Sequence, residues 1–341
     1  MFDSIAGNTN AKNALKKLIA ARRVPHALLF TGPDGIGKRQ FAFELARALL
    51  CQTPIDGEGC GTCHTCKRVG EFVIPAADKK DDFESVFVSE HPDVMMAVPY
   101  KRSILVDAIR DLEAEANYRP YEAKSRIFII DDADRMNDSA ANALLKVLEE
   151  PPETSYIILV TSRPAGLLRT IRSRCQVVRF APVEKNAIEE YLKAAGYAGD
   201  ASLAATFANG SIGKALTLDT TQFLEWRDLM LNVVKAAAGS HNLGFLLQTS
   251  EQINDAKNKD NFETVLGVLE TLIRDVWLTA NDSAELCVNN DIASRIRSLA
   301  DDVKPHVAAK WLTDIEELRQ SFAINVNRKI ATDALFVKMA A

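Results

Sequence analysis

The feature that most constrains this fold is a glycine-rich turn at residues 32–38, which reads GPDGIGK. It follows the apolar run HALLF and precedes RQFAFELARALL, in which apolar residues recur at helical spacing. This order of strand, loop and helix is typical of a phosphate-binding loop, because Gly32, Gly35 and Gly37 let backbone N–H groups turn toward phosphates. Lys38 can then reach the outer phosphates. The alternative is a glycine turn with no ligand, and spacing and context together favour the phosphate loop.

Short apolar runs alternate with helical patterns over the first half of the chain. The runs are HALLFTG, DVMMAV, RIFIIDDAD, YIILVTS and QVVRF, and this alternation predicts a mostly parallel sheet covered by helices. After Pro182 the pattern is helical throughout. We therefore expect an α/β domain at residues 1–181, a small helical domain at 182–220 and an all-helical domain at 221–341.

Composition excludes several classes of protein. Lys and Arg total 41 against 46 Asp and Glu, so the net charge of -5 gives no general attraction to nucleic acid. No uncharged apolar run reaches the length of about eighteen residues that spans a bilayer. The N-terminus also lacks an apolar segment followed by a small-residue cleavage site. We expect a cytoplasmic protein whose DNA contacts are local or shared with partners.

Four of the six cysteines crowd into residues 51–66, CQTPIDGEGCGTCHTC. Cysteine thiolates at these steps can converge on one tetrahedral zinc ion. The ligands predicted for this zinc module are Cys51, Cys60, Cys63 and Cys66. His64 lies within the module, but four thiolates already complete a closed structural site, so it is interpreted as a bystander. Two disulfides are the alternative, and a reducing cytoplasm disfavours them.

The second acidic motif is RIFIIDDAD, residues 126–134. Asp131 ends a predicted buried strand, where P-loop proteins keep the carboxylate that supports magnesium, and Asp132 stands where a catalytic Glu is usual. The residue after Lys38 should be Ser or Thr, whose hydroxyl helps to hold magnesium, but it is Arg39. A shorter acid and a lost metal ligand predict impaired hydrolysis. The alternative is that both aspartates only end a strand and cap a helix that begins near Asn137.

Residues 167–180, LLRTIRSRCQVVRF, contain the triplet Ser-Arg-Cys at 173–175. Together with NALLKVLEEPPETSYIILVTS upstream, this segment resembles the clamp-loader branch of the AAA+ ATPases. In that family the arginine of this triplet projects from one subunit toward ATP bound by the next, and Arg174 matches it. A guanidinium placed against a γ-phosphate stabilises charge that develops during transfer. Arg169 and Arg172 are competitors, for which a solvated surface role is the better interpretation.

The resemblance also implies where two further ATP-sensing residues fall. Thr161 matches the strand-end polar residue that faces the γ-phosphate in the family, although it could equally cap the strand end. The arginine expected in the helix start SIGKAL is replaced by Gly213. Arg39, Asp132 and Gly213 are three separate departures from an active ATPase, whereas Arg174 is kept. ATP or ADP binding is left open, because the glycines and Lys38 persist.

The resemblance implies an AAA+ P-loop domain with a zinc-module insertion, a helical lid domain and an all-α collar domain through which loader subunits form a ring. It further implies motor subunits and a delta subunit as partners, and a sliding clamp and primed DNA that are contacted through the assembled loader. The favoured hypothesis is a stator-like subunit that supplies Arg174 in trans. One alternative is a catalytically active motor ATPase that uses Lys38, Asp131 and Asp132. Another is a zinc-knuckle nucleic-acid binder, which the lack of interleaved aromatic residues disfavours.

Overall fold

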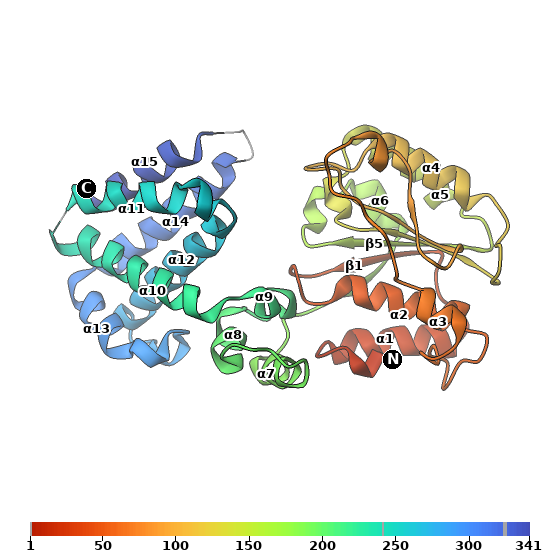
Figure 1. Cartoon of the computed structure of the whole chain (residues 1–341), viewed down its shortest axis with the longest axis horizontal. Helices are drawn as coiled ribbons and strands as arrows, with labels where there is room; N and C mark the ends of the chain where they lie inside the picture. Colours follow the sequence, from red (N-terminus) through yellow and green to blue (C-terminus); the bar gives the residue numbers. More distant parts are fainter. Residues whose placement is uncertain (1, 241, 323–325) are drawn as a thin grey trace. The chain divides into compact units, whose positions relative to one another are not determined.

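The computed structural model describes residues 2–240, 242–322 and 326–341. The chain divides into two compact units, residues 1–217 and 218–341 (Figure 1). The first unit holds the sheet and the second is helical. Within the described residues, no helix is both long and apolar enough to span a membrane.

The sheet of the first unit has the strand order β2-β3-β4-β5-β1-β6. Its strands are β1 (Ala27–Thr31), β2 (Phe87–Val88), β3 (Val94–Ala97), β4 (Arg126–Ile130), β5 (Ser155–Thr161) and β6 (Gln176–Arg179). All neighbouring pairs are parallel except β2 with β3. The predicted parallel sheet is therefore confirmed, with a short antiparallel edge strand added. β1, β3 and β4 are buried throughout, as strands covered on both faces must be.

Parallel pairing brings the carboxyl ends of the central strands to one edge of the sheet. Thr31 at the end of β1 is in register with Thr161 at the end of β5, and the Gly32 N–H donates to the Thr161 carbonyl over 3.3 Å. β4 lies on the other side of β5 and ends at Ile130. The loops after β1, β4 and β5 therefore meet at this edge, where open α/β sheets bind ligands.

Helices cover both faces of this sheet (Figure 1). The helical elements of the first unit are η1 (Phe2–Ser4), α1 (Thr9–Ala20), α2 (Lys38–Leu50), α3 (His64–Arg68), η2 (Asp81–Phe83), α4 (Val106–Ala116), η3 (Ala133–Arg135), α5 (Asp138–Glu149), η4 (Pro164–Gly166), α6 (Arg169–Arg174), α7 (Lys185–Ala194), α8 (Ala201–Phe207) and α9 (Ile212–Thr217). On one face, Leu29 and Phe128 belong to the same buried cluster as Leu112 of α4 and Leu144 of α5. On the other face, the ring of Phe180 packs against Phe41 of α2 at 4.8 Å between centroids.

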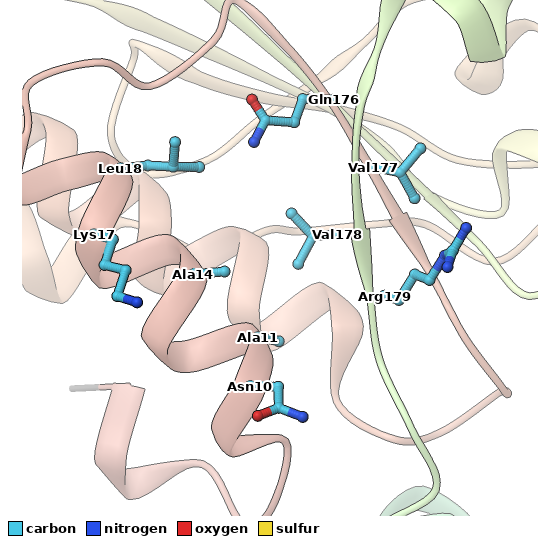
Figure 2. Close-up of a pocket in the computed structure, with 9 residues that line it drawn as sticks. All are labelled: Asn10, Ala11, Ala14, Lys17, Leu18, Gln176, Val177, Val178 and Arg179. Atoms are coloured by element: carbon cyan, nitrogen blue, oxygen red, sulfur yellow. The ribbon is translucent and has the colours of Figure 1, made fainter.

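A small pocket of about 310 Å³ lies between α1 and the edge strand β6 (Figure 2). It is lined by one face of α1, from Asn10 to Leu18, and by Gln176–Arg179 of β6. None of the residues singled out by the sequence for phosphate, metal or arginine-finger chemistry lines it. The pocket is therefore separate from the candidate site.

The second unit consists of helices packed around α12. Its elements are α10 (Thr220–Lys235), the π-helical turn η5 (Ala236–Ser240), α11 (Leu243–Asn254), η6 (Ala256–Asn261), α12 (Phe262–Ala280), η7 (Ala284–Leu286), η8 (Asn290–Ile292), α13 (Ala293–Asp302), α14 (Pro305–Ser321) and α15 (Arg328–Ala340). α12 contacts α10, α13 and α14, and α11 pairs with α15. Trp226 and Trp311 are buried among these helices. Apolar residues at three- and four-residue steps therefore form the core of this unit.

Candidate functional site

The glycine-rich turn adopts the geometry of a phosphate-binding loop. α2 begins at Lys38, directly after Gly37, whose φ of 93° lies in the left-handed region that favours glycine. Gly35 has a φ of 71°. These two glycines let the loop turn sharply from β1 into α2, so that the first N–H groups of α2 face the carboxyl edge of the sheet. The sequence-predicted strand, loop and helix are thus present around Gly32–Lys38.

The Lys38 side chain is buried under this loop and is held by the loop itself. Its Nζ donates to the carbonyl of Gly32 over 2.7 Å and to the carbonyl of Pro33 over 2.6 Å. Asp34 lies 3.9 Å from the same Nζ but is largely exposed. Burial lowers the pKa of Lys38, whereas the negative charges of Asp34 and Asp131 oppose that shift. The ammonium is therefore fixed at the centre of the loop, where it can meet a phosphate.

Arg39 points from the first turn of α2 to the second acidic motif. Its Nη1 donates to Asp131 Oδ2 over 2.9 Å, with half of the arginine side chain exposed. Asp131 follows β4, so this ion pair joins the two loops that a magnesium ion joins in other P-loop proteins. Because the arginine is half exposed, the pair contributes on the order of 1 kcal/mol or less to stability.

The other two aspartates of this motif are also matched with arginines. Asp132 Oδ2 lies 3.4 Å from Arg135 Nε, and burial, followed by the charge of Asp131, raises the pKa of Asp132. The Asp134 side chain is almost fully buried, accepts a hydrogen bond from Arg163 Nε over 2.9 Å, and forms an ion pair with Arg163 Nη2 at 2.8 Å. The sequence interpretation missed both Asp134 and Arg163. A third aspartate after a strand is an ordinary helix-start residue, and nothing in its spacing signals the partner 29 residues later.

Thr161 lies at the end of β5, as predicted, but its hydroxyl group is engaged inside the protein. Its Oγ1 donates to Asp134 Oδ1 over 2.5 Å and accepts from the Arg163 N–H over 3.0 Å. A hydroxyl group has one hydrogen to donate. While the Asp134 bond persists, Thr161 has no donor left for a phosphate oxygen.

Gly213 at the start of α9 lies directly on the phosphate-binding loop. Its N–H donates to the Gly35 carbonyl over 2.8 Å. A Cβ added to Gly213 would be 3.2 Å from Gly35 Cα, and one added to Gly35 would collide with Ser211 Oγ. Two glycines thus allow the backbones of α9 and the loop to touch. A larger residue at position 213 requires these backbones to separate.

These contacts decide whether the site fits a magnesium ion. Mg²⁺ demands near-octahedral oxygen ligands at about 2.0–2.1 Å and is usually held through one or two carboxylates. Arg39 replaces the hydroxyl ligand, and its guanidinium occupies an oxygen of Asp131. Asp132 and Asp134 have arginine neighbours of their own. The residues present therefore do not fit a P-loop magnesium site.

The four clustered cysteines converge, as predicted. The Sγ atoms of Cys51, Cys60, Cys63 and Cys66 all lie within 4.8 Å of one another, and all six cysteines of the chain are free. The Sγ of Cys51 is 3.9 Å from that of Cys63. Two disulfides, the alternative weighed above, are not formed among these residues, whereas His64 is exposed outside the cluster.

Backbone N–H groups point at these sulfur atoms in succession. The N–H of Cys60 donates to Cys51 Sγ over 3.4 Å, that of Cys63 to Cys60 Sγ over 3.3 Å, and that of Cys66 to Cys63 Sγ over 3.4 Å. N–H groups of Thr62 and Cys63 lower the pKa of Cys60 to about 5, whereas burial raises the pKa of Cys66. N–H donors favour the thiolates that bind metals. The cluster therefore fits a metal ion with four sulfur ligands.

The cysteine module is attached to the helix that follows the phosphate loop. Arg47 of α2 donates through Nε to the Cys66 carbonyl over 2.9 Å and through Nη2 to the Val69 carbonyl over 2.7 Å. Its Nη1 donates to Glu44 over 2.6 Å. This arginine ties the module to the P-loop domain, so a metal ion in the cluster would hold the insertion in place.

Arg174 ends α6 on the surface of the first unit. Its Nη2 donates to Glu149 Oε1 over 2.6 Å, and its Nη1 donates to the Thr170 carbonyl over 3.0 Å. One third of the side chain is exposed. These contacts use two of the five N–H groups of the guanidinium, and they fix its orientation. Arg169 and Arg172 are exposed on the same helix. Glu149, which ends α5, was not predicted as part of the site.

Comparison with known proteins gives matches over most of the chain. The family described as DNA polymerase III, delta subunit, matches residues 7–184, which is just over half of the chain. The DNA polymerase III subunit delta' of Escherichia coli (strain K12) is 29% identical over 333 residues, which cover 95% of this chain and 92% of that protein. The delta' subunit of Bacillus subtilis (strain 168) is 29% identical over 309 residues, which cover 89% and 88%. The gamma/tau subunit of Mycobacterium tuberculosis (strain H37Rv) is 34% identical over 173 residues, which cover 51% and 27%.

These matches define the class as a clamp-loader subunit of the AAA+ type, and the parallel sheet, the phosphate-binding loop and the acidic segment after β4 agree with it. Within this class, the matches cover 92% and 88% of the delta' subunits of Escherichia coli and Bacillus subtilis, whereas they cover 27% to 46% of the tau and gamma/tau relatives. The chain belongs to the DNA polymerase III delta' clamp-loader family.

Proposed function

We propose that this chain is the stator-like subunit of a DNA polymerase III clamp loader and supplies Arg174 in trans to ATP bound by a neighbouring motor subunit. One observation carries the proposal. Arg174 is exposed at the end of α6, is oriented by Glu149 and the Thr170 carbonyl, and keeps N–H donors for a further ligand. A guanidinium in such a position can stabilise the charge that develops on a transferred phosphoryl group.

The chain's own nucleotide site is proposed to be inactive in hydrolysis. Asp132 is shorter by one methylene group than the usual catalytic glutamate, and its side chain lies near Arg135. The Thr161 hydroxyl group donates its only hydrogen to Asp134. Gly213 contacts the phosphate loop through its backbone and has no side chain to place on a phosphate. Each change removes a different interaction that ATP hydrolysis requires in this class.

The metal of the cysteine cluster is proposed to be a structural zinc ion. A tetrahedral zinc with Zn–S bonds of about 2.3 Å places its sulfur ligands about 3.8 Å apart, and the Cys51–Cys63 separation is 3.9 Å. Four thiolates leave no coordination position for water or substrate. The zinc would therefore stabilise the 51–66 insertion against α2 and take no part in phosphate chemistry.

The proposed partners are the motor subunits and the delta subunit of the loader, with the sliding clamp and primed DNA contacted through the assembly. The residue ranges proposed for the three domains are 1–181 for the AAA+ domain, 182–220 for the lid and 221–341 for the collar. The net charge of -5 supports a shared DNA contact better than an independent one.

The finger role is tested in a reconstituted loader that contains this chain with Arg174→Ala. DNA-stimulated ATP turnover is measured after gel filtration has shown that all subunits still assemble. We expect turnover at the adjoining motor site to fall by about a hundredfold or more, in line with the effect of arginine fingers elsewhere. Arg172→Ala is the matched control, because Arg172 is exposed on the same helix, and it should leave turnover unchanged. Normal turnover by an assembled Arg174→Ala loader would overturn the proposal.

A further inference from the structure

We propose that the phosphate-binding loop of this chain binds a nucleoside di- or triphosphate without a divalent cation, with the Arg39 guanidinium supplying the positive charge. This inference concerns the chain's own site, so it stands or falls independently of the finger role proposed for Arg174. It starts from the finding that the residues around the loop do not fit magnesium.

Arg39 occupies the position of a metal ligand. It directly follows Lys38, at the place from which a Ser or Thr hydroxyl holds the magnesium ion in P-loop proteins. Its Nη1 instead lies 2.9 Å from Asp131 Oδ2. A cationic side chain thus bridges α2 to the strand-end carboxylate, as the metal ion would. The bridge is covalently attached to the protein, so it needs no ion from solution.

The remaining carboxylates at this edge of the sheet also lie beside arginines. Asp134 forms an ion pair with Arg163 at 2.8 Å and also accepts from Thr161. Asp132 lies 3.4 Å from Arg135. A magnesium ion bound through Asp131 would therefore have to displace Arg39 from that carboxylate.

Arg39 and Lys38 keep positive charge and N–H donors that a phosphate can use. Half of the Arg39 side chain is exposed, and its bond to Asp131 uses one of five N–H groups. Lys38 is held under the loop by two carbonyl groups, and α2 begins at Lys38 directly after Gly37, so that its first N–H groups adjoin the loop. Two cations and a helix N-terminus suit a di- or triphosphate chain. The guanidinium fork adds planar, paired hydrogen bonds that a hydrated metal ion does not offer.

The test measures binding of fluorescent mant-ADP to the purified full-length chain, once with MgCl₂ and once with EDTA. We expect a dissociation constant in EDTA no higher than the one with MgCl₂, because the protein provides no ligand for the metal, and Mg²⁺ in solution competes with the protein for the phosphates. A dissociation constant that rises at least about tenfold in EDTA, or the absence of binding under both conditions, would overturn the proposal.

Arg39→Thr restores the hydroxyl ligand and frees Asp131. This variant should bind mant-ADP at least about tenfold more tightly with MgCl₂ than with EDTA, since the phosphates then need the metal charge. Manganese EPR should show Mn²⁺ bound with ADP in Arg39→Thr and not in the unaltered chain. Gln40→Thr is the matched control, because it adds the hydroxyl one residue later, and removal of the metal should affect its binding as it affects that of the unaltered chain. Thermal melting checks that the variants fold. A folded Arg39→Thr chain that does not gain this dependence on metal contradicts the account, and the unaltered chain alone decides the matter if the variant does not fold.

Discussion

The candidate nucleotide site and the end of α6 both contain arginines, but the arginines have opposite surroundings in the two places. Around the phosphate loop, Asp131 and Asp134 are bonded to Arg39 and Arg163, and Asp132 lies beside Arg135. At the end of α6, Arg174 has one carboxylate partner, and a third of its side chain is exposed.

The difference shows how two sites of one domain can diverge. Around the phosphate loop, the aspartates that could hold a metal or activate water lie beside arginines of the same chain. The hydroxyl group of Thr161 is also hydrogen-bonded inside the protein. The proposed finger, Arg174, is an oriented cation that keeps further N–H donors. An internal charge pair stabilises its own carboxylate but leaves that carboxylate less able to act on a ligand. The same chain is therefore suited to serve a neighbouring site better than its own.

Metal content separates the nucleotide site from the cysteine cluster, and the expected effect is all-or-none. Purified chain should contain about one zinc ion per molecule. Cys60→Ser combined with Cys63→Ser should lose it, because two of four ligands are gone, whereas Asp131→Asn should retain it. Inductively coupled plasma mass spectrometry gives the stoichiometry. Retention of zinc by the double variant would show that the cluster is not the metal site.

A charge-conserving change tests whether the geometry of the finger matters. Arg174→Lys keeps a positive charge but lacks the planar fork, so turnover at the adjoining motor site should fall by about tenfold or more, or about 1.4 kcal/mol or more in activation free energy. The assay uses a loader in which that motor subunit has the only intact P-loop. Arg169→Lys, on the same helix, should have no effect. Equal activity of Arg174→Lys and the unaltered chain would reduce the role of Arg174 to a general electrostatic one.

The contact between α9 and the phosphate loop predicts that alanine destabilises the protein to different extents at two glycines of similar backbone conformation. Gly35 and Gly196 have φ values of 71° and 70°, but only at Gly35 would a Cβ collide with a neighbour, Ser211. Alanine at either position suffers the same backbone strain of about 1 kcal/mol. Gly35→Ala should lose about 1 kcal/mol more in the free energy of unfolding, because Ser211 Oγ must move and give up the bond that it accepts from the Lys214 N–H. Urea denaturation measures both variants, and equal losses would mean that the contact is not maintained in solution.

The smallest predicted effect concerns the residue that orients the finger. Glu149→Gln removes the charge of the carboxylate that receives Arg174 Nη2 but keeps an oxygen that accepts a hydrogen bond. We expect turnover at the adjoining site to fall by about two- to fivefold, since an exposed ion pair of this kind contributes about 0.5–1 kcal/mol. Glu149→Ala should lower turnover further. If both variants match the unaltered chain, Glu149 has no positioning role.

Much of the fold follows from patterns that the sequence displays locally. Each predicted apolar run forms a strand, and the glycine turn begins α2 at Lys38, because buried parallel strands and a P-loop leave short, continuous signals. β2 was missed because two residues, Phe87 and Val88, are too few to show a period. The convergence of the four cysteines was predictable from their spacing alone.

The partners of the site residues could not be predicted in the same way. The bond from Arg39 to Asp131 spans 92 residues, and that from Arg163 to Asp134 spans 29. Such pairs depend on which strand ends meet at one edge of the sheet, and no local pattern specifies this. The P-loop motif showed that Arg39 stands in place of a metal ligand. It could not show that the Arg39 side chain also binds the carboxylate of Asp131.

The most direct test of the account compares Lys38→Ala with Arg174→Ala in one reconstituted loader. Both variants are checked for assembly by gel filtration, and DNA-stimulated ATP turnover is then measured with the adjoining motor subunit as the only other intact site. The account predicts that Lys38→Ala leaves turnover unchanged, because the chain's own site does not hydrolyse ATP, whereas Arg174→Ala lowers it by about a hundredfold or more. Loss of turnover in Lys38→Ala together with normal turnover in Arg174→Ala would contradict it.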